Sequence, residues 1–151
     1  MNFRKATEKD LSAIVEMMAD DMLGKKRENF QNPLPIEYLN AFKNISSDKN
    51  QELIVVENED FEVIGTLQLT FIQYLNYCGG KRAQIESVII RKDKRGLGIG
   101  KSMFQWAINR AKEKNVRMLQ LTSDKQRPRA IKFYEDLGFK ATHEGMKMHF
   151  E

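Results

Sequence analysis

Apolar residues recur along this chain with two different spacings, and each spacing predicts its own kind of element. Several segments carry an apolar residue every three or four positions, which is typical of a helix with one buried face. Other segments are rich in β-branched and aromatic residues, which favour strands. The predicted helices cover residues 11–22, 36–45, 98–114 and 128–137. The predicted strands cover residues 2–6, 52–58, 61–77, 82–90, 116–122, 139–142 and 146–150.

Polar residues, glycines and prolines separate these segments. Thr7 and Asp10 resemble a capping box in front of the first helix, and Gly24 is placed to end that helix. Pro128 suits the first turn of the last helix. The polar loop at 25–35 either borders a substrate site or simply connects two helices, and the sequence leaves both interpretations open.

The order of the elements predicts the fold class. The early strands follow one another through short turns, which favours an antiparallel meander. Strand, helix and strand over residues 82–122 predict a right-handed crossover and a parallel pair. The last two strands flank Glu144 and Gly145 and are expected to form a hairpin. We therefore expect one α/β domain over residues 1–151, with a mixed, mostly antiparallel sheet of about six to seven strands, a central parallel pair and about four flanking helices.

Composition narrows the class of protein. The chain has 151 residues, and 41% of them are hydrophobic, which is enough for a folded core. No run of 18 apolar residues is present, so no membrane partner is expected. The first residues lack the apolar stretch of a secretory signal, and the single Cys78 has no internal disulfide partner. A cytoplasmic location is the expectation.

The charge is mildly basic. Twenty-five Lys and Arg residues stand against 21 Asp and Glu residues, which gives a formal charge of +4. This balance permits an anionic ligand, but it is also what a solvated charged surface would give. The only basic cluster suggestive of nucleic acid is short, so nucleic acid is not an expected partner. That cluster consists of Lys125, Arg127, Arg129 and Lys132.

One stretch, residues 85–102, combines a β-branched strand, a basic segment, a glycine loop and the start of a helix. Gly96, Gly98 and Gly100 stand at alternate positions in that loop. Glycines let backbone N–H groups approach a ligand, and a helix N-terminus offers unpaired donors and a positive dipole end. The stretch therefore predicts a phosphate-binding loop.

Two nucleotide-binding motifs do not fit this loop. A P-loop ending at Gly100-Lys101-Ser102 requires a glycine at position 95, where the chain has Arg95. The dinucleotide fingerprint requires a third glycine at position 101 or 103, where the chain has Lys101 or Met103. A third pattern, Arg/Gln-x-x-Gly-x-Gly/Ala, matches Arg95-Gly96-Leu97-Gly98-Ile99-Gly100 at every fixed position.

With this loop, the sequence resembles the GNAT superfamily of N-acetyltransferases. The later segment 133–139, Phe-Tyr-Glu-Asp-Leu-Gly-Phe, is also similar to a segment of that family. The resemblance implies that the loop holds the pyrophosphate of acetyl-CoA, and that the strand before it splays from its parallel neighbour to pair with the pantetheine arm. No metal is implied. The implied cofactor-binding residues are Val88, Ile89, Ile90, Arg95, Gly96, Leu97, Gly98, Ile99, Gly100, Lys101, Ser102, Arg127 and Phe133.

The resemblance also implies the chemistry. Tyr134 matches a family tyrosine that protonates the departing thiolate, and Glu86 stands where family members carry a carboxylate that orients or deprotonates the amine. The alternatives are a packing role for Tyr134 and a solvent-facing strand position for Glu86. Arg127 departs from the family pattern, which often has Asn at this position and uses it for the cofactor.

The expected activity is therefore acetyl transfer from acetyl-CoA to a primary amine of a small molecule or peptide, by direct attack in a ternary complex. A GNAT-like module that binds CoA without turnover is the alternative. Dimers are common in this family, so the resemblance leaves a homodimer open.

Overall fold

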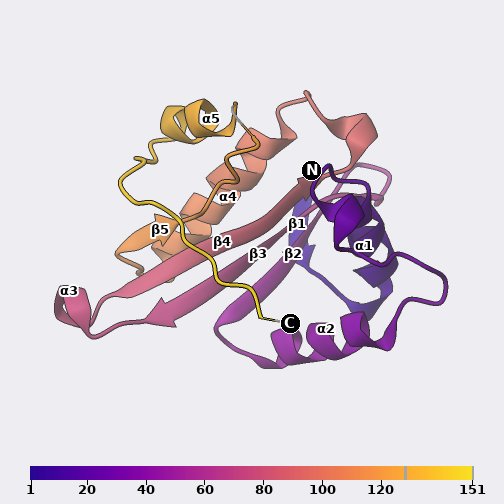
Figure 1. Cartoon of the computed structure of the whole chain (residues 1–151), viewed down its shortest axis with the longest axis horizontal. Coiled ribbons are helices and arrows are strands. Elements are labelled where there is room, and N and C mark those ends of the chain that lie inside the picture. The colour runs from indigo at the N-terminus through magenta and orange to yellow at the C-terminus, as the bar shows by residue number, and fades with distance from the viewer. Residues whose placement is uncertain (128, 151) are drawn as a thin grey trace.

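The computed structural model describes residues 1–127 and 129–150, so the expectation for Pro128 lies outside the described residues. Its strands form one sheet in the order β1-β2-β3-β4-β5 (Figure 1). Neighbours from β1 to β4 are antiparallel, and β5 runs parallel to β4. The strands are β1 Asn2–Lys5, β2 Gln51–Glu57, β3 Val63–Gln73, β4 Lys81–Ile90 and β5 Met118–Gln120. The meander and the parallel pair of the predicted α/β fold are both confirmed.

The helices follow the predicted spacing closely. They are α1 Leu11–Ala19, α2 Ile36–Ser47, the short α3 Asn76–Gly79, α4 Ile99–Glu113 and α5 Ala130–Asp136. Three-residue 3-10 turns lie at Glu8–Asp10, Gly24–Lys26 and Lys92–Lys94. In the described residues, no helix is long and apolar enough to cross a membrane.

Helix α1 begins at the predicted capping box but ends earlier than its apolar stripe suggests. The Asp10 carboxylate accepts hydrogen bonds from the backbone N–H of Thr7, at 2.7 Å, and from its hydroxyl, at 2.9 Å. The helix stops at Ala19, and Met22 is exposed. Gly24 does not end the helix. The chain there folds back so closely that a β-carbon on Gly24 would lie 1.7 Å from the Met18 carbonyl oxygen.

Both faces of the sheet are covered, by different helices. On β2, Ile54 and Val56 pack in the cluster that includes Met103 and Ala107 of α4. Alternate residues of the same strand, Leu53 and Val55, pack with residues of α1 and α2 on the other face. This alternation places α4 and α5 on one side of the sheet and the first two helices on the other.

The predicted terminal hairpin does not form, and the sheet has five strands in the described residues rather than six or seven. Residues 140–150 leave α5 as an extended, exposed trace (Figure 1). Met146, Met148 and Phe150 alternate as a strand would, yet each is at least 79% exposed. Alternation shows that one face is apolar, but a strand also needs a neighbouring edge to pair with. Because no further strand pairs with β5 in the described residues, β5 is an edge strand. The parallel pair of β4 and β5 thus lies at the edge of the sheet rather than in its centre.

Candidate functional site

Strand β4 carries a bulge just before the glycine loop. Gln68 of β3 pairs with Glu86, whereas Thr66 pairs with Ile89, so one β3 residue faces two residues of β4. Ser87 absorbs the extra residue with a φ of 52°, in the left-handed region. As a result Val88 packs on the α4 side of the sheet, the same side as Ile85, three positions before it.

Beyond this bulge, β4 and β5 are not paired. In the described residues their ladder covers only Arg82 to Gln84 on β4 and Met118 to Gln120 on β5. The segment 85–90 therefore offers backbone N–H and C=O groups on the side where β5 would continue. This is the opening that a splayed parallel pair requires.

The glycine loop leads directly into α4. Gly96 and Gly98 have φ values of 81° and 78°, which L-residues rarely adopt, and Gly98 is the N-cap of the helix. The first hydrogen bond of the helical ladder runs from the Ser102 N–H to the Gly98 carbonyl, at 3.2 Å. The N–H groups just before Ser102 have no acceptor within the helix and point along its axis. A 15-residue helix thus presents free donors at this end.

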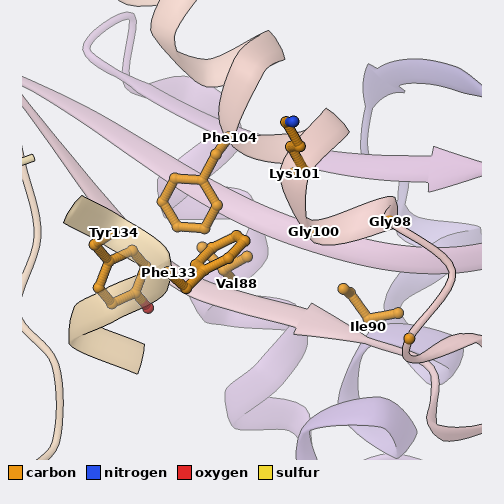
Figure 2. A pocket seen from close by; sticks show the side chains of 9 residues that line it. Val88, Ile90, Gly98, Gly100, Lys101, Phe104, Phe133 and Tyr134 are labelled. Atoms are coloured by element: carbon orange, nitrogen blue, oxygen red, sulfur yellow. The ribbon is translucent and has the colours of Figure 1, made fainter. Parts of the chain in front are cut away.

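A cavity of about 350 Å³ lies where β4, the glycine loop, α4 and α5 meet (Figure 2). Small residues and the loop form one end of it, and aromatic rings form the other. Its lining residues are Val88, Ile90, Gly96, Gly98, Gly100, Lys101, Phe104, Phe133 and Tyr134. A long ligand with an anionic end and an apolar arm suits this combination.

Tyr134 lies in an aromatic cluster at the far end of the cavity. Its ring centroid is 5.3 Å from Phe104, 5.5 Å from Phe133 and 6.2 Å from Phe139. Burial raises the pKa of the Tyr134 phenol above its usual value, and the positive charge of Arg127 opposes that rise only in part. The side chain is therefore a neutral O–H donor at physiological pH.

Comparison with known proteins identifies the family. The model of the acetyltransferase (GNAT) family matches residues 16–139. The chain belongs to the GNAT acetyltransferase family. No curated protein sequence matched the chain.

Solved structures share this GNAT fold over almost the whole chain. A protein described as a transcriptional regulator from Bacillus halodurans C-125 is 56% identical, with 99% of each chain covered and a TM-score of 0.95. A predicted acetyltransferase with acetyl-CoA from Clostridium acetobutylicum is 26% identical, covering 98% of this chain and 95% of that one, with a TM-score of 0.73. Glucosamine-6-phosphate N-acetyltransferase from Arabidopsis thaliana is 20% identical, covering 99% and 98%, with a TM-score of 0.80. This last likeness concerns the fold alone.

The GNAT structure brings together most of the site residues that the sequence predicted. Eight of the nine residues that line the cavity are among them; the ninth is Phe104. Ile99 is buried in the core and Leu97 is 70% exposed, and neither lines the cavity. Ile89 is buried too, and Ser102 lies in the first turn of α4.

Seven predicted residues lie outside the lining of the cavity: the four just described and three charged ones, Glu86, Arg95 and Arg127. Glu86 alternates with Ile85, which packs on the α4 side, so the carboxylate lies on the opposite face of the sheet, where it is exposed. The Arg95 side chain donates a hydrogen bond from Nε to the Ile90 carbonyl at 3.0 Å. Arg127 donates from Nη2 to the Asp21 carboxylate at 2.5 Å.

Three features near the site were not predicted from the sequence: Phe104, the bulge at Ser87 and the buried Asp21. Phe104 stands one helical turn after Gly100, and that spacing would have placed it on the cavity side of α4. The bulge at Ser87 leaves no local signal, because it depends on the register between two strands. Asp21 gave no signal either, since its partners lie far away along the chain.

In the part of the chain that the structure describes, no three His, Cys, Asp or Glu side chains are grouped to hold a metal ion.

Proposed function

We propose that this GNAT protein transfers the acetyl group of acetyl-CoA to a primary amine of a small molecule or peptide, in a ternary complex. One observation supports this proposal most strongly. A single cavity connects the free N–H groups of the glycine loop to the half-buried, hydroxyl-bearing ring of Tyr134. Binding of an anionic cofactor and protonation of a leaving group would thus take place in one continuous space.

The residues present suit acetyl-CoA. The N–H groups of residues 96–101 and the Lys101 ammonium would hold the pyrophosphate, because a helix N-terminus stabilises an anion. The edge of β4 at Val88, Ile89 and Ile90, which is not paired with β5, would hydrogen-bond to the amides of the pantetheine arm. The rings of Phe104 and Phe133 would cover its apolar part. Arg95, Leu97, Ile99, Ser102 and Arg127 complete the proposed binding set, through backbone groups in the case of Leu97 and Ile99.

Tyr134 is assigned the acid role. When bound, acetyl-CoA supplies an activated acyl group as a thioester. Attack by the amine would form the carbon–nitrogen bond and break the carbon–sulfur bond, and sulfur would take the electron pair. The Tyr134 phenol would then give its proton to sulfur, and it carries this proton at neutral pH because burial raises its pKa.

Glu86 is assigned to the amine. Its carboxylate lies on the opposite face of the sheet, one residue before the bulge. An acceptor on that face would meet the thioester through the opening between β4 and β5. Glu86 would then orient the amine or take its proton, directly or through water.

A second candidate function comes from the 56% identical relative, which is described as a transcriptional regulator. DNA binding by this chain would need a basic surface, and the nearest one is the cluster of residues 125–132. Three of its cations are paired within the chain. Lys125 lies 3.7 Å from Glu144, Arg127 contacts Asp21, and Lys132 contacts Asp136. This pairing weakens the field available to phosphates, so we favour the enzyme over the DNA-binding regulator.

A screen that measures thiol release from acetyl-CoA with a panel of primary amines tests the proposal. We expect turnover with at least one amine, a large fall in kcat for Tyr134→Phe, and little change for the matched control Tyr77→Phe, an exposed tyrosine. Glu86→Gln should lower the rate with cofactor affinity retained, whereas Glu59→Gln in an exposed turn should not.

Other results would favour other functions. Binding of CoA without turnover of any amine would favour a CoA-binding module that is not an enzyme. Salt-sensitive gel shifts with DNA would favour the regulator. Homodimer formation and the single-domain organisation stay predictions, which sedimentation and limited proteolysis can check.

A further inference from the structure

Asp21, in the segment after α1, is a buried carboxylate that does not line the cavity. Only 8% of its side chain is exposed. It accepts a hydrogen bond from Arg127 Nη2 at 2.5 Å, and Arg95 Nη2 lies 3.9 Å from its other oxygen. The backbone N–H of Leu23 also donates to it, at 3.2 Å. One carboxylate thus joins three segments that are far apart in the sequence.

The two arginines belong to segments that lead to different walls of the cavity. Arg95 belongs to the glycine loop, and its Nε is fixed on the carbonyl of Ile90, which lines the cavity from β4. Arg127 stands just before α5, where its carbonyl accepts the Ala130 N–H. Helix α5 supplies the aromatic wall through Phe133 and Tyr134. The contacts of Asp21 therefore link the β4 side of the cavity with the α5 side.

The charges of Asp21 and the two arginines explain why these side chains lie together. A carboxylate buried to this extent is stable only with cationic or hydrogen-bonding partners, and the two arginines supply them. A pair of guanidinium groups that converges on one anion also binds phosphate, often in a bidentate manner. A phosphate of acetyl-CoA carries at least as much negative charge as the carboxylate. It is therefore a direct competitor for the same two arginines.

We propose that Asp21 serves as an internal substitute for a phosphate: it holds Arg95 and Arg127 in the free protein, and a phosphate of acetyl-CoA displaces it on binding. This inference rests on the proposed function, because it assumes that acetyl-CoA binds at the glycine loop. It gives Arg127, which stands where the family often has Asn, a specific task in cofactor binding. It also links cofactor binding to the segment after α1.

The consequence for that segment follows from its contacts. Residues 20–27 are held by the Asp21 ion pairs and by the tight approach of Gly24 to Met18. When Arg127 leaves Asp21, the Leu23 N–H and the carboxylate lose part of their fixed environment. The segment that leads into the loop at 25–35 then becomes more mobile only after the cofactor has bound.

Equilibrium binding to three probes tests the proposal, with Asp21→Asn compared with wild type. The matched control is Asp20→Asn, which removes the same charge from an exposed neighbour. CoA and dephospho-CoA are measured by calorimetry, and pantetheine, which has no phosphate, by competition. We expect Asp21→Asn to bind CoA about five to ten times more tightly than wild type, as loss of one partly exposed ion pair implies. Pantetheine affinity should not change.

The probes also separate the two sources of phosphate. A gain that persists with dephospho-CoA assigns the pyrophosphate to the arginine pair, and a gain confined to CoA assigns the 3′-phosphate. Either result supports displacement. Equal or weaker CoA binding by Asp21→Asn overturns the proposal, as does an equal gain for pantetheine or for Asp20→Asn.

A measurement on wild type keeps the test valid if Asp21→Asn does not fold. Hydrogen exchange in residues 20–27 should become at least several-fold faster when CoA saturates the protein, and should not change with pantetheine. Unchanged or slower exchange with bound CoA overturns displacement and leaves the acetyltransferase proposal standing. A wild-type protein that binds no CoA refutes both.

Discussion

Replacement of Gly100 by alanine is expected to change stability and cofactor binding in opposite directions. Gly100 lies in the first turn of α4 with ordinary helical φ, whereas Gly98, two residues earlier, has a φ of 78°. A β-carbon on Gly100 would lie 3.3 Å from the Ile90 Cδ1 atom and 3.8 Å from the Phe133 Cζ atom. Both neighbours line the cavity, so the new methyl group would occupy the space that we assign to acetyl-CoA.

The magnitudes follow from these two environments. Alanine is favoured over glycine in a helix by about 0.5–1 kcal/mol, and the terminal methyl of Ile90 can move by a few tenths of an ångström to admit it. Gly100→Ala should therefore leave the free energy of unfolding unchanged or raise it by up to about 1 kcal/mol. A methyl group beside the helix N-terminus should weaken CoA binding by at least about 1.4 kcal/mol, which is tenfold.

Gly98→Ala is the matched comparison. Its β-carbon would have no neighbour within 4 Å, so only backbone strain acts, and the left-handed conformation should lower stability by about 1–2 kcal/mol. Urea unfolding and calorimetric titration with CoA measure both quantities for each variant. If Gly100→Ala binds CoA as tightly as wild type, the cofactor does not lie against this turn. If Gly98→Ala is as stable as wild type, the strain argument is wrong.

Other consequences concern charge. The hydrogen bond from Arg4 lowers the pKa of Asp10 from 3.8 to about 2, so the carboxylate stabilises the fold above the higher value. About 2 kcal/mol of the free energy of unfolding is lost as the pH falls from above 3.8 to below about 2. Acid unfolding of Asp10→Asn should not show this loss. Arg110→Ala should cost about 2–3 kcal/mol in urea unfolding, because Glu52, 3% exposed, loses the guanidinium 2.6 Å away and keeps Lys114 at 3.6 Å; Glu52→Gln in that background should recover much of it. Because burial raises the pKa of Tyr134 above its usual value of 10.0, kcat should show no alkaline fall with a midpoint below that usual value, and such a fall would contradict its role as acid.

Local patterns were sufficient for much of the fold. Periodicity located all four long helices, and the strands of the meander followed from their β-branched runs. The capping box of Thr7 and Asp10 formed as its residue types predict. These features depend on contacts within a few residues, so neighbours in the sequence determine them. The conformation of the glycine loop is also determined locally, because the positions of its glycines decide where the backbone can adopt a positive φ.

Other parts of the structure depended on distant neighbours. The apolar alternation of residues 146–150 describes one face of a strand, but it does not encode which edge the strand pairs with, and in the described residues β5 stays an edge strand without this partner. The bulge at Ser87 exists only relative to the register of β3.

The site shows the same division. The chain by itself predicted a phosphate-binding loop at residues 95–102, because the conformations of glycines and of a helix start are local. Only the tertiary structure decided that Tyr134 and Phe104 close the cavity from two helices. It also decided that Glu86 lies on the other face of the sheet, and that Asp21 holds Arg127. Ion pairs between residues about a hundred positions apart depend on packing, which no local pattern encodes.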